Sequence, residues 1–177
     1  MLFRSPYRYI AGIDSYDFDT STTNSVGSMV VFDRVTDRIV AHYKGRPERA
    51  QDFHEGCRRI LAYYEATANF ENANIGIFDH FDKKKSQQML CDCPEIIKVE
   101  ELVKQKLTGN RKKGTPPTTP VKVFGLNALK KWLETSATGE PEGSEITNVM
   151  TVQSIGILKE VIAWEEVGNY EDRKSVV

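Results

Sequence analysis

Short apolar runs in the first part of the chain predict β-strands. Residues 8–14 form a mostly apolar run that ends in an acid, Asp14, as expected for a buried strand with a carboxylate at its carboxyl end. Two further β-rich runs, 28–32 and 38–43, flank a short polar segment. This arrangement predicts a hairpin with a loop of medium length.

A helix is expected after the hairpin. Pro47 suits its first turn, because the fixed φ of proline matches the helical value. Apolar residues then recur at every third or fourth position, which predicts a helix face directed toward the core. This stripe consists of Ala50, Phe53, Cys57, Ile60, Leu61 and Tyr64. His54 lies beside the stripe and is expected on the helix surface.

The remaining pattern alternates short elements with loops. A strand at 69–72 follows the helix, so it can lie parallel to the first strand, with Glu71 near its carboxyl end. Further helices are expected at 75–81, around 124–133 and around 158–162, and Gly- and Pro-rich loops at 109–120 and 138–145. This order predicts an α/β layer fold with a mixed sheet flanked by helices, and excludes a helical bundle or a β-sandwich.

Composition adds broad limits to this picture. The chain has 177 residues, of which 40% are hydrophobic and 28% charged, with a net charge of -1, so we expect one globular domain. No window approaches the ~18 consecutive apolar residues of a membrane span, and the N-terminus lacks the apolar run of a secretory signal. We therefore expect a reducing, cytosolic environment in which Cys57, Cys91 and Cys93 are free thiols.

Charge is strongly segregated along the chain. The segment 102–133 contains no acid, and its basic residues are Lys104, Lys106, Arg111, Lys112, Lys113, Lys122, Lys130 and Lys131. The segment 134–172 has nine acids and Lys159 as its single basic residue. Asp14, Asp17 and Asp19 form another acidic cluster. Such a chain can hold a polyanion with its basic segment and metal ions with its carboxylates; the alternative is two solvated faces.

The two strand-end acids are the most informative candidates for chemistry. If the strands that end in Asp14 and Glu71 are parallel and central, both carboxylates emerge at the edge where α/β proteins build their sites. Carboxylates select Mg²⁺ or Mn²⁺, and two such ions can hydrolyse a phosphodiester. The alternative is a pair of solvated strand-end acids.

Gly109 and Gly114 have the spacing of a phosphate-binding P-loop. However, Thr115 and Pro116 stand where that motif requires Lys and Ser or Thr, so the sequence does not predict a P-loop.

Several short segments together resemble the C-terminal nuclease domain of tailed-phage terminase large subunits, from about Tyr9 to Arg173. These segments are 11–17, 27–31, 43–47, 63–66, 70–72 and 169–173. The resemblance implies a ribonuclease H-like fold and a metal-dependent endonuclease that cuts concatemeric viral DNA during genome packaging. No Walker motif is present, so residues 1–177 are expected to form the nuclease domain without the ATPase domain of the full-length protein.

The resemblance also implies site residues and partners. Asp14, Glu71 and Asp172 would hold two Mg²⁺ or Mn²⁺ ions, with Glu171 able to replace its neighbour. The chain ends shortly after Asp172, so weaker metal affinity is expected. Arg111, Lys112 and Lys113 would hold the DNA backbone. The sequence leaves open whether Asp17 and Asp19 contact the metal, directly or through water, or merely lie in a loop. The implied partners are double-stranded DNA, the ATPase domain, the portal and the small terminase subunit, in the host cytoplasm and without a membrane.

Two alternatives remain open at this point. One is a resolvase- or integrase-like nuclease of the same fold, which would prefer branched DNA. The other is a noncatalytic module that docks DNA, portal or small subunit through the basic loop, with solvated strand-end acids.

Overall fold

Four strands form one mixed sheet in the computed structural model, which describes residues 7–17, 26–73, 75–99 and 113–166. The strands are β1 (Tyr9–Asp14), β2 (Gly27–Asp33), β3 (Arg38–Gly45) and β4 (Thr67–Phe70), in the spatial order β3-β2-β1-β4. β1, β2 and β3 are antiparallel neighbours, whereas β4 runs parallel to β1. The predicted mixed sheet and hairpin are confirmed.

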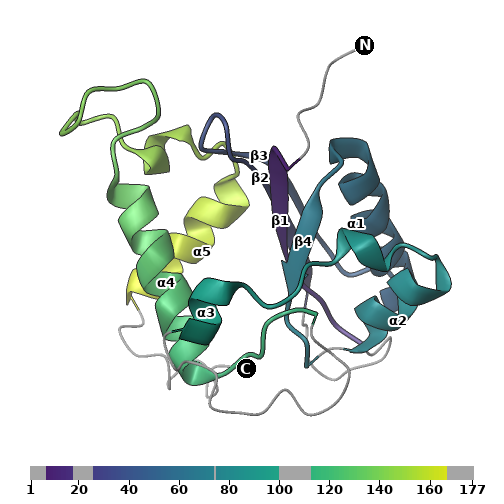
Figure 1. Cartoon of the computed structure of the whole chain (residues 1–177). Coiled ribbons are helices and arrows are strands. Elements are labelled where there is room, and N and C mark those ends of the chain that lie inside the picture. The colour runs from purple at the N-terminus through teal and green to yellow at the C-terminus, as the bar shows by residue number, and fades with distance from the viewer. Residues whose placement is uncertain (1–6, 18–25, 74, 100–112, 167–177) are drawn as a thin grey trace.

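Helices flank the sheet on both sides (Figure 1). The α-helices are α1 (Ala50–Tyr64), α2 (Ile75–Lys83), α3 (Glu95–Val99), α4 (Thr119–Glu134) and α5 (Ile155–Glu166), and the 3₁₀ helices are η1 (Gln87–Met89) and η2 (Asn148–Thr151). α1 and α2 lie on one side of the sheet, and α4 and α5 lie on the other (Figure 1). The α/β class is therefore confirmed. No described helix combines the length and apolar character that a bilayer crossing requires.

The core lies between the sheet and the α1–α2 pair. Alternate strand residues face it, since successive side chains of a strand point to opposite faces. The buried strand residues are Ala11, Ile13, Met29, Val31, Ala68 and Phe70, and the buried helix residues include Phe53, Cys57, Leu61, Ile77 and Phe81. The opposite face is less covered; Ile10, for example, is 41% exposed. There, α4 contacts the sheet through Trp132, whose ring lies 5.5 Å from that of Phe32.

Two predicted boundaries differ from the structure. The helix begins at Ala50 rather than at Pro47, because Arg49 is still extended (φ -115°, ψ 133°). The carbonyl of Pro47 instead accepts a hydrogen bond from Tyr16. The fourth strand is 67–70 instead of 69–72, since pairing with β1 begins with Ile10 opposite Thr67.

The prediction that His54 lies on the helix surface is wrong. Its side chain is buried at 1% exposure, and its ring lies 6.0 Å from that of His80 on α2. The physical reason is that α2 packs against the flank of α1 next to the apolar stripe. The periodicity of one helix does not show where a second helix will pack.

The other local predictions agree with the described part of the chain. The helices expected at 75–81, around 124–133 and around 158–162 are α2, α4 and α5. Residues 138–145 form no helix or strand, and neither do 113–118, although the rest of the predicted 109–120 loop lies outside the described residues. Its last two residues begin α4. The three cysteines are free thiols, as predicted.

A partly buried ion pair joins Arg8, just before β1, to the end of β2. Two guanidinium nitrogens of Arg8 donate to the Asp33 carboxylate, at 2.6 to 3.1 Å. Asp33 also accepts from the backbone N–H of Val35 at 2.9 Å, which fixes the turn toward β3. The hydrogen bonds from Arg8 lower the pKa of Asp33 to about 2, from an ordinary value of 3.8. The pair therefore secures the edge of the sheet opposite Asp14.

Asp33→Asn is expected to lower the free energy of unfolding by about 1–3 kcal/mol at pH 7, because Arg8 loses a charged acceptor. Since the folded-state pKa lies below the unfolded one, this stabilisation is present above about pH 4 and is lost as the pH falls toward 2. Urea unfolding of both proteins at pH 7 and pH 2.5 measures the difference. Asp79→Asn, which alters an exposed carboxylate on α2, is the matched control. If the loss of unfolding free energy caused by Asp33→Asn were as large at pH 2.5 as at pH 7, the stabilising role of the Arg8–Asp33 pair would be contradicted.

Candidate functional site

Asp14 and Glu71 emerge next to each other at the carboxyl edge of the sheet. β1 and β4 are parallel neighbours, and their register pairs Ile13 with Phe70. Asp14 directly follows Ile13, and Glu71 directly follows Phe70. Ile13 and Phe70 are buried in the core, so the alternation of β1 turns Asp14 toward the side of α4 and α5. The structure thus brings together the two acids that the sequence places at strand ends.

The surroundings raise the pKa of Asp14. Although its side chain keeps contact with solvent, nearby protein atoms displace part of its hydration, and this is the largest cause. The Glu71 carboxylate raises the pKa further, the Lys122 ammonium opposes the shift, and Glu160 on α5 adds a small increase. Ionisation of Asp14 is therefore less favourable than that of an ordinary aspartate, and a bound cation would favour the ionised form.

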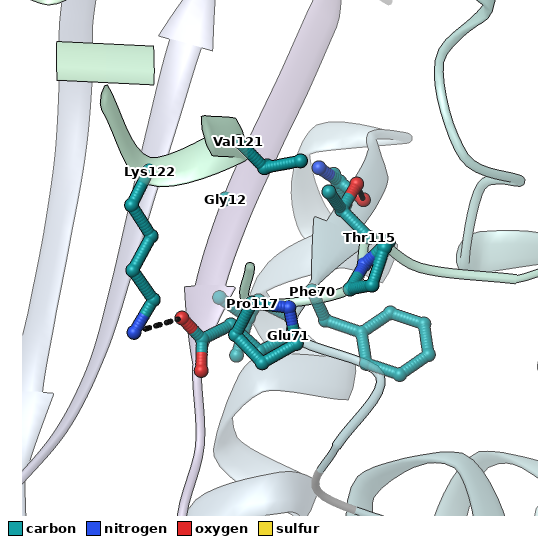
Figure 2. Close-up of a pocket in the computed structure, with 10 residues that line it drawn as sticks. Gly12, Phe70, Glu71, Thr115, Pro117, Val121 and Lys122 are labelled. Carbon is teal, nitrogen blue, oxygen red and sulfur yellow. Dashed lines mark hydrogen bonds and ion pairs between the residues drawn. The ribbon is translucent and has the colours of Figure 1, made fainter. Parts of the chain in front are cut away.

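Lys122 is the basic partner of this acidic pair. It lies in the first turn of α4, and its Nζ atom is 3.7 Å from Oε1 of Glu71. Figure 2 shows the two side chains directed toward each other at the edge of a cavity. This cavity has a volume of about 190 Å³ and is lined by residues 12–13, 69–71, 115–117 and 121–122. In the sequence, Lys122 belongs to the basic segment 102–133, and charge alone does not distinguish it from its neighbours.

A short extended segment closes one side of the cavity. The Thr115 N–H donates to the Phe70 carbonyl at 2.8 Å, and the Asn72 N–H donates to the Thr115 carbonyl at 3.1 Å. The Thr115 hydroxyl also donates to the side-chain oxygen of Asn69 at 2.9 Å. These bonds hold the segment alongside the end of β4. No local sequence pattern indicates this role of Thr115.

Gly114 permits that close approach. Its φ is +75°, and a Cβ atom there would lie 2.8 Å from the Phe70 carbonyl oxygen. Side-chain-bearing residues rarely adopt this φ, and a backbone carbonyl does not move aside easily. Gly114 belongs to a glycine-rich loop in the sequence. Its positive φ and its closeness to the Phe70 carbonyl both favour glycine at this position.

Asp17 has a structural partner in the described part of the chain. Its two carboxylate oxygens accept hydrogen bonds from the N–H groups of Ile75 (2.8 Å) and Gly76 (3.0 Å), at the start of α2. Such bonds satisfy N–H groups that have no partner within the helix. Asp17 thus anchors the chain after β1 to α2. Asp19, also considered near the metal, lies outside the described residues.

Lys113 is described, and its side chain is engaged within the protein. Its ammonium donates to the Leu90 carbonyl at 2.5 Å and lies 3.6 Å from Asp92. The other predicted DNA-binding residues, Arg111 and Lys112, lie outside the described residues.

The donor set fits a hard divalent cation in part. Asp14 and Glu71 supply two adjacent carboxylates, the ligand type that Mg²⁺ and Mn²⁺ prefer. Among the described residues, no group of three or more His, Cys, Asp or Glu side chains is arranged to hold a metal ion. The predicted third ligand, Asp172, and its neighbour Glu171 lie outside those residues.

Gly114→Ala is expected to destabilise the protein by about 1–3 kcal/mol more than Gly143→Ala. Both glycines have a positive φ, +75° and +82°, but only Gly114 among this pair meets nearby atoms where a Cβ would be built. The difference between the variants therefore isolates the contact with the end of β4. Urea unfolding measures it, and equal losses in the two variants would contradict the proposed close approach.

No protein-family model, curated protein or solved structure matches this chain.

Proposed function

We propose that this protein is a metal-dependent DNA endonuclease of the terminase nuclease type, with a ribonuclease H-like fold. In this proposal it cuts concatemeric viral DNA during genome packaging in the host cytoplasm. Its partners are double-stranded DNA and, in the full-length protein, the ATPase domain, the portal and the small terminase subunit.

One observation carries the proposal: Asp14 and Glu71 directly follow paired residues of two parallel strands, so both acids emerge at the carboxyl edge of the sheet and their charges interact. This edge is where α/β proteins commonly build their sites. Two solvated acids without a function would have a lower electrostatic energy if they lay farther apart, because like charges repel. Here the strand register holds them together, beside a cavity and a lysine.

Each residue has a defined task in this site. Asp14 and Glu71 bind the metal, and Asp172 or Glu171 completes the ligand set. Bound there, divalent ions supply an activated water and neutralise the charge that develops on the leaving oxygen of a phosphodiester. Arg111, Lys112 and Lys113 attract the DNA backbone, which for Lys113 requires exchange of its partners Leu90 and Asp92. Because backbone contacts carry little sequence information, cutting is expected to be nonspecific.

Asp14→Asn and Glu71→Gln are each expected to reduce plasmid cleavage at least about 100-fold, because each removes a metal-binding charge at little change in volume. The measurement is conversion of supercoiled plasmid to nicked and linear forms with Mn²⁺, Mg²⁺ or EDTA. Asp79→Asn, with an exposed acid on α2, is expected to cut like the parent.

Full cleavage by Asp14→Asn under saturating Mn²⁺ would exclude this site as the catalytic centre. A strong preference for branched over linear duplex DNA would favour a resolvase-like enzyme with the same carboxylates.

Millimolar Mn²⁺ is expected to stabilise the folded protein, because a ligand that binds only the native state raises its stability. At ten times the dissociation constant, the expected rise in Tm is about 3–6 °C. Differential scanning fluorimetry measures the rise, which Asp14→Asn should abolish and Asp79→Asn should preserve. If the parent showed no rise up to tens of millimolar Mn²⁺, a noncatalytic binding module would be favoured.

A further inference from the structure

Lys122 has an unusual position for a surface lysine. It lies in the first turn of α4, where the helix macrodipole disfavours a positive charge. Its ion pair with Glu71 is 3.7 Å long, and both side chains are 37% exposed. Partly exposed ion pairs of this kind add little to stability. The ion pair with Glu71 by itself therefore adds little to the stability of the protein.

The surroundings of Lys122 indicate a different role. The residue lines the cavity next to Glu71, and Gly12 of β1 lines it as well. The place of a Cβ atom on Gly12 has no other atom within 4 Å, so the strand leaves open space just before Asp14. An anion in this cavity would lie between the carboxylate edge and the positive end of α4.

A lysine at this position also improves the charge balance of the site for a bound phosphate. Two adjacent carboxylates repel a DNA phosphate, so a phosphate that approaches them needs positive charge close by. The Lys113 ammonium lies at the Leu90 carbonyl and near Asp92, and the Lys130 ammonium lies 4.0 Å from Glu134 on its own helix. Lys122, by contrast, already has its ammonium at the carboxylate pair.

We infer that Lys122 is a phosphate-binding residue of this site. Its ammonium pairs with Glu71 in the free protein and turns to a nonbridging phosphate oxygen when DNA enters the cavity. This inference rests on the proposed function, because it takes the phosphodiester of DNA as the occupant. Lysine serves such a role as a point charge on a flexible stem, which allows the exchange of partners.

The test measures DNA binding separately from cleavage. A fluorescein-labelled 20-base-pair duplex is titrated with the full chain between 50 and 200 mM KCl, with Ca²⁺ as the metal, and anisotropy gives the affinity. Lys122→Gln is expected to weaken binding several-fold and to reduce the slope of log affinity against log salt by about one, the loss of one phosphate contact. Lys122→Arg, which keeps the charge, is expected to retain the parent slope.

Lys130→Gln is the matched control, because it removes the same charge from the same helix, two turns away from the cavity. Equal salt slopes for Lys122→Gln and Lys130→Gln would overturn the inference. Plasmid cleavage with Mn²⁺ then separates the two proposals. A parent that binds with the Lys122-dependent slope but never cuts would refute the nuclease and retain the phosphate contact. A parent that cuts while Lys122→Gln binds and cuts equally well would retain the nuclease and refute the role of Lys122.

Discussion

The parallel pairing of β1 with β4 places two negative charges at one edge of the sheet, and the surrounding features depend on that contact. The pairing is possible because α1 connects the antiparallel hairpin to β4 and packs Phe53 and Leu61 on the buried face of the sheet. The hydrophobic core thus stabilises a register that the two carboxylates by themselves would oppose. Core packing in this way holds the charges together at the cavity.

Backbone hydrogen bonds secure both sides of this edge. On one side, Asp17 ties the chain after β1 to the start of α2. On the other, Thr115 ties the chain before α4 to the end of β4. These two anchors hold the described segments on either side of the carboxylates, and a site that must hold charges in fixed positions benefits from such support.

The electrostatics of the site are balanced by residues from three elements. Asp14 and Glu71 raise the local negative charge, and Lys122 offsets it from the start of α4. The raised pKa of Asp14 shows that one lysine does not compensate for desolvation and a second carboxylate. A divalent cation would supply the missing positive charge, which is why the proposed nuclease and the inferred phosphate contact share one physical basis.

Local patterns in the sequence determined the strands, most helices and the position of Asp14 and Glu71 at strand ends, because periodicity and turn residues act over a few neighbouring positions. Only the tertiary structure decided the burial of His54, the capping role of Asp17 and the pairing of Lys122 with Glu71. Each of these depends on packing between segments that are far apart in the chain. Such packing follows from the fit of whole surfaces, which no single local pattern contains.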